Sequence, residues 1–288
     1  MSTLKIRELL GLPGQRSSSV SRRMLFKHAT VLGAAAVAGT VLSPTASALG
    51  DHDGDEDDEM PHSSNLRPGD RSILIAAEIA EALAVTTYSN IINLSPFFTR
   101  IPDDDQGYIK AALQEEMSHY ALEESVTNEN SPFDEFFYPK QMFVDTQTTL
   151  NTLVTLEDAF IAAYLVGVRD FSSRALRVTA ARIMGIESDH RTLARVIGPD
   201  VAAMDGGPIM SVTGAQGVQE SVAPPNNNGY ERTLCWTKIS QAVDALTPFV
   251  DEEAAENAGF DISKTYKFKP FTPTLPNPLG DFFSYSGC

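Results

Sequence analysis

Residues 115–120 read EEMSHY, and residues 186–191 read IESDHR. In each stretch a histidine follows a glutamate at a distance of three, which pairs Glu116 with His119 and Glu187 with His190. Side chains three apart on an α-helix lie on one face, so each pair can point at a single spot. A pair of this kind is either ordinary surface charge or part of a metal site, and the surrounding sequence decides between the two.

The residues around both stretches predict four helices of about 20 to 25 residues, each without an internal proline. The expected segments are residues 70–94, the residues after the acidic cluster 103–105 as far as 125, residues 145–171, and residues 174–197. Asp70 is the expected N-cap of the first helix, and Gly198 with Pro199 is expected to end the fourth. The pattern predicts an all-α fold, an antiparallel four-helix bundle.

An internal repeat relates the first helix to the third. The first contains AEALAVTTY and the third contains LEDAFIAAY, so each has a glutamate followed seven residues later by a tyrosine. Each is then followed by a helix that carries Glu-x-x-His. We therefore expect two related hairpins, residues 81–119 and 157–190, that face each other about a pseudo-twofold axis.

The glutamates of this repeat, Glu81 and Glu157, lie in the least polar parts of their helices, where an unpaired buried carboxylate is costly. Of the five histidines, only two lie in the region expected to fold, and both have the glutamate three residues before them. One Glu from each of two helices and Glu-x-x-His from the other two is the ligand pattern of dimetal carboxylate bundles. The sequence therefore predicts a site for two iron or manganese ions, with six ligands: Glu81, Glu116, His119, Glu157, Glu187 and His190.

Residues 70–197 resemble the exported ferritin-like domain family, which includes proteins described as desiccation-related. The order of the ligands is similar to that of bacterioferritin and rubrerythrin. The resemblance implies a ferritin-like bundle in which two glutamates are terminal ligands, two bridge, and each histidine caps one metal ion. By this resemblance the terminal ligands would be Glu81 and Glu157, and the bridging ligands would be Glu116 and Glu187. The capping histidines would be His119 and His190.

The resemblance also implies a redox role for Tyr88, which matches a tyrosine that lies beside the metal centre in ferritins. Its counterpart Tyr164 is expected to be ordinary core. Glu78 lies a turn away from the matched position and is not expected to be a ligand. Glu115 and Tyr120 are expected to face away from the site.

The first 48 residues resemble a twin-arginine export signal. Arg22 and Arg23 precede a weakly apolar Ala/Gly/Val stretch, and an Ala-Ser-Ala cleavage site ends at Ala48. That stretch is too short to span a bilayer stably, so no membrane span is expected after cleavage; an uncleaved anchor or basic tail is the alternative. The mature protein is expected in the extracellular, periplasmic or cell-wall space, and residues 49–69 are expected to form a disordered acidic linker.

The charge of the mature chain excludes nucleic acid as a partner. The whole chain has a formal charge of −16, and its first 48 residues carry six Lys/Arg against one Glu. The remainder therefore carries 16 basic and 37 acidic side chains, a net charge of −21. Binding to phosphates needs a basic face, which this composition does not provide.

Residues 198–288 are expected to form an irregular extension because they are rich in Gly, Pro and Asn. One helix is expected near residues 233–250, and the chain past Phe260 is expected to wrap the bundle as an extended tail. Cys235 and Cys288 either form a disulfide or remain two thiols.

Two functions agree with these features. The first is a di-iron or di-manganese oxidoreductase that acts on O2 or peroxide, either oxidising Fe(II) or dismutating peroxide. The second is a structural or binding protein of stress protection, with a non-catalytic metal or none. The sequence allows an oligomer and does not specify its size.

Overall fold

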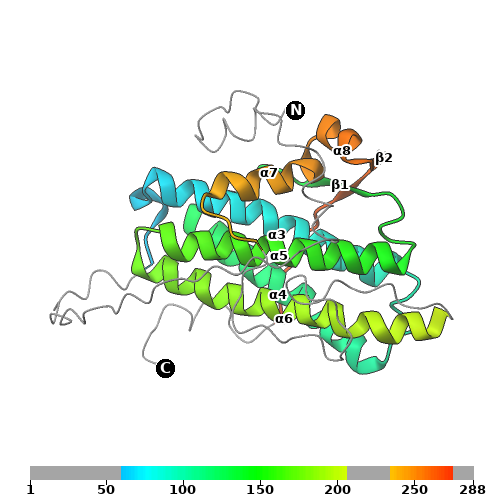
Figure 1. Cartoon of the computed structure of the whole chain (residues 1–288). Helices are drawn as coiled ribbons and strands as arrows, with labels where there is room; N and C mark the ends of the chain where they lie inside the picture. The colour runs from blue at the N-terminus through cyan, green and yellow to red at the C-terminus, as the bar shows by residue number, and fades with distance from the viewer. Residues whose placement is uncertain (1–59, 206–233, 275–288) are drawn as a thin grey trace, which may run out of the picture.

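The computed structural model describes residues 60–205 and 234–274 (Figure 1). Its body consists of α3 (Pro68–Leu94), α4 (Asp103–Thr127), α5 (Thr146–Asp170) and α6 (Arg174–Asp205). α3 packs against α4 and α5 packs against α6, and these two hairpins meet where α3 contacts α5 and α4 contacts α6. The predicted all-α bundle is confirmed. The predicted export signal and most of the predicted linker lie outside the described residues.

α3 is apolar on most of its faces because α4, α5 and α7 (Ile239–Val250) all pack against it. Figure 1 shows α7 lying across the α3 side of the bundle. Both α3 and α5 are long and apolar enough to cross a membrane, and 83% and 61% of their most apolar windows are buried inside the protein. Because these helices are so deeply buried, carboxylates on them are shielded from solvent.

The predicted starts of the first and third helices have different outcomes. α5 begins at Thr146, close to the predicted start, and Asp145 caps it because its carboxylate accepts from the Thr148 N–H at 2.8 Å. Asp70 is not an N-cap: α3 begins at Pro68, a residue suited to the first turn because its missing N–H is not needed there. Asp70 is buried instead, and its carboxylate accepts from the Ser172 N–H at 2.8 Å. This bond ties the start of α3 to the turn between α5 and α6.

The prediction that Gly198 and Pro199 end the fourth helix is wrong, because α6 continues to Asp205. Proline has a helical φ, so a helix can continue through it at the cost of one hydrogen bond and a local bend. α7 contains Pro248 in the same way.

A small sheet joins the loop after α4 to the C-terminal extension. β1 (Glu135–Pro139) pairs antiparallel with β2 (Phe260–Lys267), in a register that places Pro139 opposite Phe260. The short helix α8 (Glu252–Ala258) precedes β2. The sequence predicted a loop, one helix and a tail here, so the two strands and α8 were missed. The tail does reach the bundle, since the Thr274 N–H donates to Gln114 Oε1 of α4 at 2.9 Å. Cys288 lies outside the described residues, and its pairing stays a prediction.

Candidate metal centre

The six predicted ligands come together in the centre of the bundle. Each of the four helices contributes at the predicted position, and the four glutamates have no exposed surface. Their donor atoms form two overlapping groups in which all atoms lie within 4.8 Å of one another. The first group is Glu81, Glu116, His119 and Glu187, and the second is Glu116, Glu157, Glu187 and His190. The two groups share two glutamates, so they define two adjacent positions.

The shared glutamates divide their oxygens between the two positions. Glu116 places Oε2 3.5 Å from His119 Nδ1 and Oε1 2.9 Å from His190 Nδ1. Glu187 places Oε1 3.1 Å from His119 Nδ1 and Oε2 3.5 Å from His190 Nδ1. A carboxylate that turns one oxygen to each of two positions has the arrangement of a bridging ligand.

The donor atoms that face these positions lack hydrogen-bond partners among the described residues. They are eight in number: Glu81 Oε2, Glu116 Oε1 and Oε2, His119 Nδ1, Glu157 Oε2, Glu187 Oε1 and Oε2, and His190 Nδ1. Leaving buried polar atoms unpaired costs about 1–3 kcal/mol each. The histidine Nδ1 atoms lie 2.9–3.6 Å from the glutamate oxygens, but these atom pairs are not aligned as hydrogen bonds. Such separations resemble the distance between neighbouring ligands of one metal ion, which is about 3.0 Å in an octahedron with 2.1 Å bonds. The residues therefore fit a pair of metal ions.

The charges of the site require a compensating positive charge. Burial raises the pKa of Glu81 and Glu157 well above the usual carboxyl value, and the neighbouring carboxylates raise it further. Burial also acts to raise the pKa of Glu116, but His190 and His119 outweigh it and the pKa is lowered. Although burial opposes it, the surrounding carboxylates raise the pKa of both histidines well above its ordinary value. Four carboxylates in so dry a place hold either protons or metal cations.

Two tyrosines hold the terminal glutamates in a crossed arrangement. The Tyr88 hydroxyl of α3 donates to Glu157 Oε1 of α5 at 2.7 Å, and its ring lies edge-on to His190 with centroids 5.6 Å apart. The Tyr164 hydroxyl of α5 donates in turn to Glu81 Oε1 of α3. Tyr88 therefore lies beside the site as predicted. The expectation that Tyr164 is ordinary core is wrong, because Tyr164 donates to Glu81 just as Tyr88 donates to Glu157.

Glu115 is a site residue that the sequence reasoning missed. Its Oε2 lies 2.9 Å from His190 Nε2, on the far side of the imidazole from the two metal positions. The hydrogen bond to His190 lowers the pKa of Glu115, so the carboxylate is charged near neutral pH. The expectation that Glu115 faces elsewhere is wrong. That expectation holds for Tyr120, whose hydroxyl accepts from the Ser131 N–H at 3.1 Å in the loop after α4.

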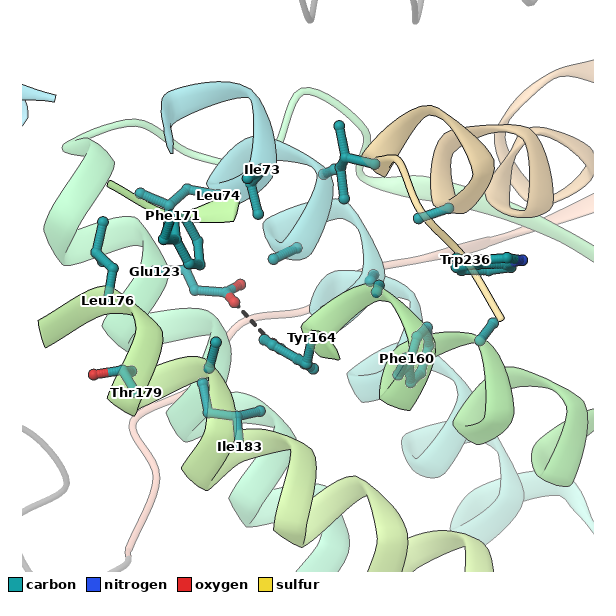
Figure 2. Close-up of a pocket in the computed structure, with 18 of the residues that line it drawn as sticks. Ile73, Leu74, Glu123, Phe160, Tyr164, Phe171, Leu176, Thr179, Ile183 and Trp236 are labelled. Carbon is teal, nitrogen blue, oxygen red and sulfur yellow. Dashed lines mark hydrogen bonds between the residues drawn. The ribbon is translucent and has the colours of Figure 1, made fainter. Parts of the chain in front are cut away.

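Two further buried carboxylates lie beyond Tyr164. Glu123 Oε1 is 2.8 Å from the Tyr164 hydroxyl, a contact drawn in Figure 2. Glu78 accepts a hydrogen bond from the Thr127 hydroxyl. Burial raises the pKa of Glu78 to about 7 and that of Glu123 well above its usual range. Neither belongs to the two groups of donor atoms.

Residues 69–197 match the family model of the ferritin-like domain. The chain has no significant match among curated proteins, and none among solved structures. The matched range covers α3 to α5 and the part of α6 that carries the site. The part of the chain that matches the ferritin-like domain therefore folds as a helical bundle, and it holds a buried cluster of carboxylates and histidines that could bind metal. The desiccation-related type and the ligand order stay predictions.

Proposed function

We propose that the protein is an oxidoreductase whose bundle holds two first-row metal ions, iron or manganese, and acts on O2 or peroxide. Oxidation of Fe(II) is the most concrete form of this activity. Bound ions of this kind supply one-electron steps toward O2 or peroxide. The four carboxylates would balance the charge of two divalent ions, and a set of oxygen and imidazole ligands suits iron and manganese.

The division of Glu116 and Glu187 between two positions carries this proposal. A single-ion site would not need two carboxylates that each turn one oxygen to a different histidine. Ordinary surface pairs would be exposed, whereas these glutamates have no exposed surface. The observation thus favours a dinuclear site over a single-ion site and over ordinary surface charge.

The chain's own residues prepare each donor atom. The tyrosines take Oε1 of Glu157 and Glu81, which leaves Oε2 of each glutamate without a partner and facing the site. A hydrogen bond from the His190 Nε2–H to Glu115 would keep the proton on Nε2 and the lone pair on Nδ1. These contacts fix which atom of each side chain is presented to a metal ion.

We also propose that the protein is exported by the twin-arginine route and acts in stress protection. Support for export comes from the paired arginines, the weakly apolar stretch and the cleavage site within residues 1–48. Because that route carries folded proteins, the dinuclear site would be assembled before export. Placement outside the cytoplasm also suits a protein with a net charge of −21 after the signal.

The test is anaerobic loading of the purified protein with Fe(II), followed by addition of O2 or hydrogen peroxide in separate experiments. We expect the wild type to consume at least one of the two oxidants as Fe(II) is oxidised. Glu116→Gln should lose this activity, and Glu124→Gln should retain it because Glu124 lies on the same helix outside the donor groups. Two bound ions with no consumption of either oxidant would reject the redox proposal and favour the structural alternative.

A further inference from the structure

An apolar pocket lies beside the metal centre, between α3, α5, α6 and the start of α7 (Figure 2). Its walls include Ile73 and Leu74 of α3, Phe160 of α5, and Leu176 and Ile183 of α6. The cavity volume is about 30 Å³, and one water molecule needs roughly 10–15 Å³. The pocket therefore has room for a molecule of only a few atoms.

The pocket lies one side chain away from a predicted metal ligand. Tyr164 forms part of the wall, and its hydroxyl donates to Glu81. Glu123 also lines the pocket, and Figure 2 shows its carboxylate directed at the Tyr164 hydroxyl. A molecule in the pocket is thus separated from Glu81 by the Tyr164 phenol.

Part of the pocket wall lies closer to solvent. Four of its wall residues are only half-buried: Ala77, Ala163, Trp236 and Ile239. They come from α3, α5 and α7 and from the segment before α7, and α7 packs on both α3 and α5. The pocket wall therefore combines half-buried apolar side chains with the buried side chain of Tyr164.

The polarity of the walls selects an apolar occupant. A well-held buried water makes two to four hydrogen bonds, and Glu123 Oε2 is the buried wall atom of the described residues that lacks a partner. The Thr179 hydroxyl already contacts Met60 Sδ at 3.8 Å. Hydrogen peroxide would leave most of its hydrogen-bonding groups unpaired here, which is costly. Dioxygen has no such groups and is small enough.

We infer that this pocket is a binding site for dioxygen on its way to the metal centre. The inference rests on the proposed oxidoreductase function, and it names O2 rather than peroxide as the oxidant that the fold admits. Small apolar gases collect in dry apolar cavities, and xenon, which binds such cavities, reports on them without any reaction.

Xenon binding to the purified protein, followed by 129Xe NMR or in xenon-pressurised crystals, tests the pocket directly. Wild type should take up xenon against Tyr164. Ala77→Leu and Ala163→Leu should lose it, because each fills the pocket from a half-buried wall that tolerates a larger side chain better than the core. Ala111→Leu is the matched control, since Ala111 is half-buried on α4 and outside the pocket. Absence of xenon from the wild-type pocket would overturn the inference.

Oxidation kinetics of the same proteins, loaded with Fe(II), test the role of the pocket. Filling it should slow the reaction with O2 by about tenfold, the factor that corresponds to 1.4 kcal/mol, and leave any reaction with hydrogen peroxide and the metal content unchanged. An O2 rate in both filled variants equal to that of wild type would overturn the inference while leaving the proposed function intact. A wild type that consumes neither oxidant would instead overturn the proposed function.

Discussion

Replacing Glu78 by glutamine is expected to make the stability of the protein less dependent on pH. Glu78 has no exposed surface, its Oε2 lacks a partner, and burial raises its pKa from 4.5 to about 7. Since the folded pKa is the higher one, the folded state keeps the proton at pH values where the unfolded state has lost it. Protonation of Glu78 therefore stabilises the folded state. This contribution is complete below pH 4.5 and is lost as the pH rises through 7.

The difference of 2.5 between the two pKa values, at about 1.36 kcal/mol per unit, corresponds to about 3 kcal/mol. Most of this change, about 2.5 kcal/mol, falls between pH 5 and pH 8. Glutamine never ionises, and its amide oxygen can still accept from the Thr127 hydroxyl. Glu78→Gln should therefore become more stable relative to wild type by about that amount as the pH rises over this range.

The free energy of unfolding of wild type and Glu78→Gln is measured by urea unfolding at pH 5 and at pH 8, in the same chelating buffer. Comparison at each pH removes contributions common to the two proteins, including those of the metal centre. Glu256→Gln, an exposed position, should show a stability difference from wild type that does not vary with pH. A difference between Glu78→Gln and wild type that stays constant from pH 5 to pH 8 would refute the reasoning.

Three other predictions concern the site and its support. Tyr88→Phe should keep both metal ions but slow oxidation, as measured by metal analysis with stopped-flow kinetics; unchanged kinetics would contradict the predicted redox role. Glu115→Gln should weaken metal affinity by roughly 10–100-fold, as measured by competition with a chelator, and an unaltered affinity would remove Glu115 from the site. Gly167→Ala should destabilise by about 1–3 kcal/mol in urea unfolding, because its new Cβ would lie 2.9 Å from the Phe171 ring. Gly185→Ala, with no atom within 4 Å of its Cβ, should be neutral or stabilising, and equal losses in both glycine variants would contradict the packing argument.

The four helices could be predicted because helical spacing and N-terminal acidic residues are local signals. The third predicted segment, 145–171, differs from α5 by one residue at each end. The strands β1 and β2 could not be predicted in the same way, because each finds its partner more than a hundred residues away. The end of α6 was missed because Gly-Pro usually stops a helix and tertiary packing can override that preference.

The metal centre was predictable where the helical period fixes neighbours. Spacing alone places His119 beside Glu116, and the apolar surroundings of Glu81 indicate a buried carboxylate. Contacts between helices carry no such signal. The Tyr164 hydrogen bond to Glu81 and the approach of Glu115 to His190 depend on how α3 meets α5 and how α4 meets α6. The equal spacing of Glu81 to Tyr88 and of Glu157 to Tyr164 is the sequence signal for the contact that Tyr164 makes.

The most direct test of the dinuclear site is the metal content of protein purified from its own cell, measured for wild type and Glu116→Gln. Because Glu116 faces both positions, its replacement should remove both ions together rather than one. The account predicts two iron or manganese ions per wild-type chain and close to none in the variant. Fewer than one transition metal ion per wild-type chain, or an unchanged content in Glu116→Gln, would contradict it.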